Sequence, residues 1–187
     1  MEVVYHGSPE GGLTVITPRV STHNKSYVYA TRDVRLATIF LQHWNDFVFN
    51  VSYGDGHALE ITERYAGALE EVYEGRNGHV YQLDAHSFIS NATGFDGEVV
   101  SEQVQKVLGC QAIENVYERL LQMNKEGLLQ IYRYPNRPKY IPQDDSDLVE
   151  MAWEIYCRTG DRGVIAYCIS KHPGLHSELT QRMPMGR

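Results

Sequence analysis

Residues 3–8 read VVYHGS and residues 26–31 read SYVYAT, and these two stretches decide the expected fold. Each is a short apolar and aromatic run that ends in small or hydroxylated residues, a pattern typical of a β-strand. A segment with helical spacing, Asp33 to Gln42, follows the second run directly. We therefore expect the strand that carries His6 and the strand that carries Tyr29 to lie side by side and to frame one pocket.

The composition predicts a folded protein. Of the 187 residues, 42% are hydrophobic and 22% are charged, which supports a core in one domain or in a domain with a small appendage. The net charge of -7 argues against broad binding to nucleic-acid backbones, which needs clustered Lys and Arg. The three cysteines, Cys110, Cys157 and Cys168, have no close spacing, which favours free thiols over a disulfide framework or a zinc site.

The sequence also predicts where the protein is found. It shows no pattern of a secretory signal, and no apolar run approaches the roughly 20 residues that a membrane helix needs. Free thiols are typical of a reducing compartment. We therefore expect a cytoplasmic protein with no membrane partner.

Short strands and helices alternate up to about residue 140. Besides the two opening strands, the pattern predicts strands at 47–53, 58–62, 98–100, 104–108 and 128–134. It predicts a hairpin in which residues 72–75 and 79–83 flank a turn at Asn77-Gly78, and an amphipathic helix from Cys110 to Met123. Thr31 is expected to cap the helix that begins at Asp33.

The pattern changes after a segment with three prolines, residues 135–142. Only helices are expected beyond it, at 146–159, 161–171 and 173–183. We therefore predict an α+β fold in two parts, a mixed domain over 1–140 and a helical extension over 141–187.

The first two strands carry motifs that resemble a known family. His6-Gly7-Ser8 resembles the His-Gly-Ser or His-Gly-Thr that ends the first motif strand of ADP-ribosyltransferases of the His-Tyr-Glu class, which includes the diphtheria-toxin and poly(ADP-ribose) polymerase groups. Val28-Tyr29-Ala30-Thr31 is similar to the second motif. In the polymerase group the next helix carries a small residue and then an aromatic one, and Ala37 and Phe40 stand at those offsets.

The third motif of this family is a Glu at the head of a strand. Glu98-Val99-Val100 is similar to it, with Glu98 in the catalytic position. Two residues depart from the family pattern: Val99 replaces the usual aromatic residue, and Ala37 stands where Ser is frequent. The resemblance covers roughly residues 3 to 110, and the helical extension has no counterpart in it.

The resemblance implies split antiparallel sheets around NAD, which is the substrate, and transfer of ADP-ribose to an acceptor. Glu98 would stabilise the charge that develops on the ribose when the nicotinamide bond breaks. His6 would bind a ribose hydroxyl, Gly7 would hold the nicotinamide amide through its backbone, and Tyr29 would stack on the nicotinamide ring. The full set of implied NAD-binding residues is His6, Gly7, Ser8, Tyr27, Tyr29, Ala37 and Phe40, with Glu98, His6 and Tyr29 as the catalytic group and no metal.

Several alternatives stay open. Tyr27 shares a face with Tyr29 and competes for the stacking role, and Glu102 competes with Glu98. The acceptor is a protein, a nucleic acid or a small molecule that the sequence does not identify, as in a toxin or a host-modifying effector, and the oligomeric state is open as well. A related enzyme that removes a 2′-phosphate from RNA with NAD would need several Arg and His ligands for phosphate. A third alternative is an inactive member of the fold that binds a nucleotide or a protein.

Overall fold

A computed structural model describes residues 2–20, 25–54 and 58–183 of the chain. The strands are β1 (Val3–Ser8), β2 (Val15–Ile16), β3 (Arg19–Val20), β4 (Ser26–Thr31), β5 (Phe49–Tyr53), β6 (Leu59–Glu63), β7 (Gly78–Asp84), β8 (Ile89–Ser90), β9 (Glu98–Ser101), β10 (Gln105–Ile113) and β11 (Leu129–Tyr132). The α-helices are α1 (Val34–Ile39), α2 (Ala68–Tyr73), α3 (Val116–Lys125), α4 (Ser146–Thr159), α5 (Arg162–Lys171) and α6 (His176–Arg182). This mixture of helices and antiparallel sheet confirms the predicted α+β class.

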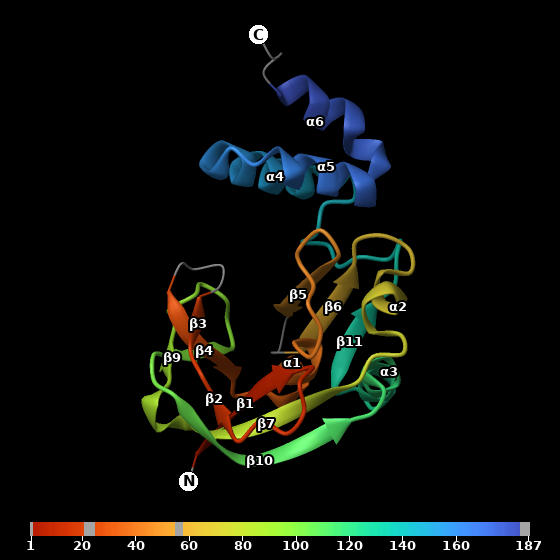
Figure 1. The fold of residues 1–187 in the computed structure, drawn as a ribbon. Helices are drawn as coiled ribbons and strands as arrows, with labels where there is room; N and C mark the ends of the chain where they lie inside the picture. The colour runs from red at the N-terminus through yellow and green to blue at the C-terminus, as the bar shows by residue number, and fades with distance from the viewer. Residues whose placement is uncertain (1, 21–24, 55–57, 184–187) are drawn as a thin grey trace. The chain divides into compact units, whose positions relative to one another are not determined.

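The larger sheet has the order β2-β10-β7-β1-β4-β9-β8, and β3 also pairs with β4. Its ladders between β1, β4, β7, β9 and β10 are all antiparallel. Figure 1 shows β1, in red, beside both β4 and β7. The expectation that the strands of His6 and Tyr29 are neighbours is therefore confirmed. A smaller sheet has the order β11-β6-β5.

The predicted hairpin around Asn77-Gly78 is wrong. Residues 68–73 form helix α2 instead of a strand, and β7 pairs with β1 and β10. The helix is stabilised by burial, since Tyr73 is fully buried and its hydroxyl donates to the carbonyl of Ile39 at 2.8 Å. Long-range pairing and burial thus outweigh the local preference of Asn-Gly for a tight turn.

Two further local predictions need correction. Residues 110–113 belong to β10, where Ile113 pairs with Gly78, so the helix predicted from Cys110 begins only at Val116. The cap of α1 is Asp33, whose side chain accepts a hydrogen bond from the Arg35 amide, and not Thr31. Thr31 holds the capping residue itself, because its hydroxyl accepts a hydrogen bond from the Asp33 amide at 3.0 Å.

The chain divides into two compact units, each made of separate segments. The first contains residues 1–44, 52–60 and 69–130, and the second contains 45–51, 61–68 and 131–187. All of the predicted extension 141–187 lies in the second unit, and a boundary at residue 140 stays a prediction. Within the described residues, no helix has both the length and the apolar character needed to cross a membrane.

Each unit has its own apolar cluster. In the first unit the cluster gathers residues of β1, β4, β7 and β9, among them Val4, Val28, Leu83 and Val99. In the second unit the cluster joins Phe47 to α4, α5 and the segment that follows them. Every residue of the predicted site belongs to the first unit.

Candidate functional site

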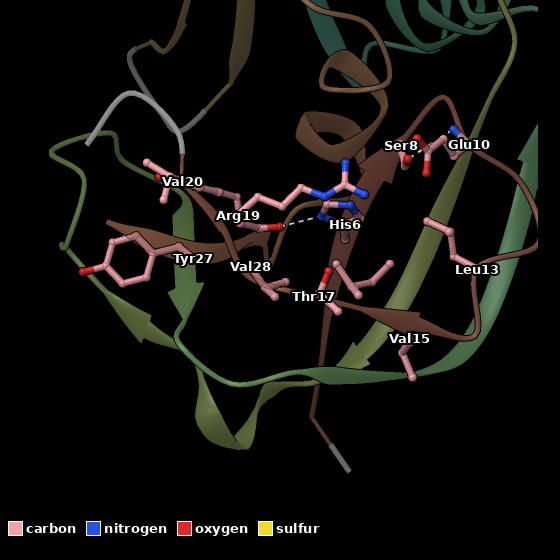
Figure 2. Close-up of a pocket in the computed structure, with 12 residues that line it drawn as sticks. His6, Ser8, Glu10, Leu13, Val15, Thr17, Arg19, Val20, Tyr27 and Val28 are labelled. Carbon is pink, nitrogen blue, oxygen red and sulfur yellow. Dashed lines mark hydrogen bonds between the residues drawn. The ribbon is translucent and has the colours of Figure 1, made fainter. Parts of the chain in front are cut away.

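His6 and Tyr29 meet at one cavity in the first unit. The Nδ1 atom of His6 lies 2.7 Å from the carbonyl oxygen of Tyr29. A cavity of about 310 Å³ adjoins this pair, and Figure 2 shows the His6 ring among the side chains that line it. The lining residues come from β1, β2, β3, β4 and the segments between them: His6, Ser8, Glu10, Leu13, Val15, Ile16, Thr17, Arg19, Val20, Tyr27, Val28 and Tyr29.

The bond to Tyr29 decides which nitrogen of the neutral His6 ring carries the proton. A carbonyl oxygen only accepts hydrogen bonds, so Nδ1 must carry a proton and donate it. Burial lowers the pKa of His6, the bond to Tyr29 partly offsets this, and the charge of Arg19 lowers the pKa further. The net pKa is below the ordinary value of 6.5. At neutral pH the ring is therefore uncharged, and Nε2 is a hydrogen-bond acceptor.

The predicted site residues do not all line this cavity. His6, Ser8, Tyr27 and Tyr29 line it, while Glu98 lines a second cavity of about 610 Å³. The remaining predicted residues, Gly7, Ala37 and Phe40, line neither of these two cavities. The structure thus brings half of the predicted residues together and places the proposed catalytic carboxylate in a neighbouring cavity of the same unit.

The sheet register relates Glu98 to the Tyr29 strand. Glu98 lies opposite Thr31, and Val100 lies opposite Tyr29. Residues that face each other across a ladder, and residues two apart on one strand, point to the same side of a sheet. The side chains of Tyr29 and Glu98 therefore lie on one side, while the backbone carbonyl of Tyr29 holds His6 at the edge of the first cavity.

Tyr27 competes with Tyr29, and Glu102 with Glu98, and within each pair the two residues differ in their surroundings. Tyr27 is 4% exposed and meets Tyr29 edge to face with ring centroids 5.9 Å apart, whereas Tyr29 is half-buried. Glu98 is half-buried at the head of β9 and lines a cavity, whereas Glu102 is exposed just after the end of β9. These differences favour Tyr29 and Glu98 for contact with a ligand.

Gly7 and Ala37 form the contact between β1 and α1. A Cβ atom on Gly7 would lie 2.3 Å from the carbonyl oxygen of Ala37, so only glycine permits this close approach. Ala37 itself is fully buried. Phe40, at the end of α1, is half-buried and stacks on Trp44 with the rings inclined by 6°, and Phe95 meets it edge to face. The predicted roles of these residues toward NAD stay predictions.

The second cavity holds a second carboxylate beside Glu98. Asp33 receives three hydrogen bonds from the Arg35 guanidinium, at 2.8, 3.1 and 2.6 Å, and one from the Tyr53 hydroxyl at 3.1 Å. Burial raises the pKa of Asp33, but the hydrogen bonds and charge of Arg35 outweigh that effect, so the pKa lies below its ordinary value. Burial also raises the pKa of Tyr53 well above its ordinary value. Asp33 is thus a stable anion that caps α1.

Gly97 precedes Glu98 and has a backbone conformation that favours glycine. Its φ angle of +88° is in the left-handed region that favours glycine. A Cβ atom at this position would lie 2.8 Å from Cε2 of Tyr53, so the Tyr53 ring packs directly against the glycine. The residue before Glu98 therefore has both a conformational and a steric reason to be glycine.

Sequence reasoning did not find Arg19 as a site residue. Arg19 belongs to the two-residue strand β3 and lines the His6 cavity. Its backbone pairs with Tyr27 of β4. A two-residue strand is too short for an alternation signal, so no sequence pattern marked this position.

Comparison of the chain with known proteins identified no related protein. Searches against family models, curated proteins and solved structures found no match. Among the described residues, no group of three or more His, Cys, Asp or Glu side chains is arranged to hold a metal ion.

Proposed function

We propose that this protein is an NAD-dependent ADP-ribosyltransferase. The observation that carries the proposal is the orientation of His6. Its Nδ1 atom donates to the Tyr29 carbonyl at 2.7 Å, which leaves Nε2 as an acceptor in a ring that lines a cavity. A ribose hydroxyl is a donor that matches this acceptor. The cavity volume of about 310 Å³ lies at the lower end of the range for small-molecule sites.

The proposed reaction needs a carboxylate near the ribose. The bond between nicotinamide and the ribose C1′ breaks, its electron pair leaves with nicotinamide, and a nucleophile of the acceptor forms the new bond to C1′. Positive charge develops on the ribose as this bond breaks, and an anion beside the ring stabilises that charge. Glu98 is the proposed anion. Its support is the β4–β9 register, which puts its side chain on the same side of the sheet as Tyr29.

A second candidate function is an inactive member of the same fold that binds a nucleotide. One observation favours it: His6 and Glu98 line different cavities. The RNA 2′-phosphotransferase alternative has less support. It calls for several Arg and His ligands for phosphate, and the described residues that line the first cavity include one arginine and one histidine, Arg19 and His6.

Nicotinamide release tests the proposal. The wild-type protein, Glu98→Ala and Glu102→Ala would each be incubated with NAD, with binding of NAD followed separately by calorimetry. Glu102 is the matched control, because it is an exposed glutamate four residues further along the chain. We expect turnover in the wild type and in the Glu102 variant, and its loss in the Glu98 variant.

The other outcomes separate the candidates. Binding of NAD without nicotinamide release would support the inactive binding module. Undiminished release by Glu98→Ala would remove Glu98 from its proposed role. An absence of NAD binding at millimolar concentration would refute both candidates.

A further inference from the structure

Arg19 is a charged side chain beside His6. Both residues line the first cavity, and the charge of Arg19 lowers the pKa of His6, which requires the two groups to be close. Figure 2 shows the Arg19 side chain extending toward the His6 ring. The backbone of Arg19 pairs with Tyr27, so the side chain projects from an anchored strand position.

Within residues 2–20, 25–54 and 58–183, no carboxylate forms an ion pair with Arg19. Six other described arginines form ion pairs with carboxylates of the same chain. These ion pairs include Arg32–Glu2, Arg35–Asp33, Arg64–Asp147, Arg133–Glu63, Arg137–Asp145 and Arg182–Glu150. Arg19 thus brings a positive charge without an ion pair among the described residues to the wall of a cavity that Glu10 also lines.

The pairing of this cation with a neutral histidine matches one ligand chemistry. A guanidinium presents a planar set of donors that fits phosphate oxygens, while neutral Nε2 of His6 accepts from a hydroxyl. A nucleoside diphosphate carries these two groups next to each other, because its phosphate is attached to the ribose. The hydroxyl of Ser8, which is 8% exposed and lines the same cavity, adds a donor.

We propose that Arg19 binds the diphosphate of the nucleotide while His6 binds the adjoining ribose. This inference rests on the proposed function for the identity of the substrate, NAD, but its test does not depend on turnover. It assigns the first cavity to the ribose-diphosphate part of the ligand. In this assignment His6 binds the adenosine ribose, and the second cavity, with Glu98, is left for the nicotinamide ribose, where the proposed reaction needs the carboxylate.

The test compares two ligands that differ only in the diphosphate, ADP and adenosine. Their binding would be measured by calorimetry for the wild type, Arg19→Gln, Arg19→Lys and Arg76→Gln. Arg76 is the matched control, because it is an exposed arginine of the same unit that lines neither cavity. Circular dichroism would verify that each variant is folded.

We expect Arg19→Gln to weaken ADP binding about tenfold or more, since a charge-assisted hydrogen bond is lost. Adenosine binding should change by less than about twofold, which separates a phosphate contact from a general effect on the cavity. Arg19→Lys should retain part of the affinity for ADP because the charge remains but the two-pronged geometry is lost. Arg76→Gln should bind both ligands like the wild type.

Equal loss of both ligands in Arg19→Gln would overturn the inference, and so would unchanged ADP binding or a wild type that does not bind ADP. The outcome for the proposed function is read independently. Wild-type protein that binds ADP through Arg19 but releases no nicotinamide would leave this inference standing and refute the transferase. Normal release of nicotinamide by Arg19→Gln, with an unchanged KM for NAD, would support the transferase and refute the role of Arg19.

Discussion

The Nδ1 atom of His6 donates a hydrogen bond to the carbonyl oxygen of Tyr29, 2.7 Å away, although 23 residues separate the two in the sequence. This bond fixes the orientation of the imidazole and selects the tautomer in which Nε2 accepts. It also joins β1 to β4 at the edge of the first cavity. The chemistry proposed for the cavity depends on this relationship.

The first prediction is a loss of nucleotide affinity at acid pH. The pKa of His6 in the folded protein is below its ordinary value of 6.5, so the ring is neutral at pH 7 and becomes protonated on acidification. Protonated Nε2 has no free lone pair and no longer accepts a hydrogen bond from a hydroxyl. Affinity for ADP should be constant above pH 7 and should fall by up to about tenfold per unit once the pH is below the folded pKa. Calorimetry between pH 8 and 5 measures this.

The matched variant for this test is His6→Gln, whose affinity should be lower and should lose the His6 contribution to the pH dependence. The lowered pKa of His6 also affects the stability of the fold. A depressed histidine pKa stabilises the fold above the unfolded pKa, and that contribution is lost as the pH falls toward the folded pKa. A wild-type affinity that stays flat down to pH 5 would contradict the role given to Nε2.

The second prediction concerns Gly97, the residue before Glu98. Gly94 and Gly97 both have positive φ angles, +80° and +88°, so alanine at either position incurs a similar conformational cost of about 1 kcal/mol. Only at Gly97 does the new Cβ meet the Tyr53 ring, 2.8 Å from Cε2. Gly97→Ala should therefore displace Glu98 and reduce kcat for nicotinamide release, while Gly94→Ala should leave kcat near the wild-type value.

Thermal unfolding should accompany these kinetics, because it shows whether the two variants lose comparable stability. Equal kcat values for the two alanine variants would show that the Tyr53–Gly97 contact does not position Glu98.

The third prediction is that Gly7 tolerates no side chain. An alanine Cβ at Gly7 would lie 2.3 Å from the carbonyl oxygen of Ala37, and relief of that overlap would require β1 and α1 to move apart. We expect Gly7→Ala to lower the free energy of unfolding by about 1–3 kcal/mol. The control is Gly174→Ala, where no atom lies within 4 Å of the added carbon and the expected change is within about 0.5 kcal/mol. Denaturant titration distinguishes the two, and a Gly7 variant as stable as wild type would argue against this packing.

The fourth prediction concerns a buried ion-pair network in the second unit. Arg64 and Arg137 have side chains that are each 2% exposed; Arg64 pairs with Asp147, and Arg137 donates to Asp145 at 2.6 Å. Asp145→Asn should destabilise the protein by about 3 kcal/mol or more, because it leaves a buried guanidinium without its carboxylate. Asparagine is the appropriate replacement because residue 145 has a φ of +56°, which Asn accepts.

Glu150→Gln is the control for this network, since Glu150 pairs with Arg182 on the surface and its side chain is 59% exposed. Its expected cost is below about 1 kcal/mol. Thermal and denaturant unfolding measure both variants. Similar small losses in the two would show that the buried pair contributes no more than the exposed one.

Much of the fold could be predicted from the chain alone. Strands β1, β4 and β9 were predicted because apolar and aromatic residues are concentrated in short runs that end at small or polar residues, and α1 was predicted from the spacing of Val34, Ala37 and Leu41. Two of the predictions that were wrong share one cause. Around Asn77-Gly78, and again after Cys110, a local preference was overruled by pairing with strands distant in the sequence.

The sequence by itself determined the residue types of the candidate site and the strands that carry them, because periodicity and strand ends are local properties. Tertiary structure decided the rest. It joined His6 to Tyr29, placed Arg19 beside His6, and assigned Glu98 to a separate cavity. Strand order and register are set by ladders between residues far apart in the chain, and side-chain neighbours across such ladders leave no pattern within a short stretch of sequence.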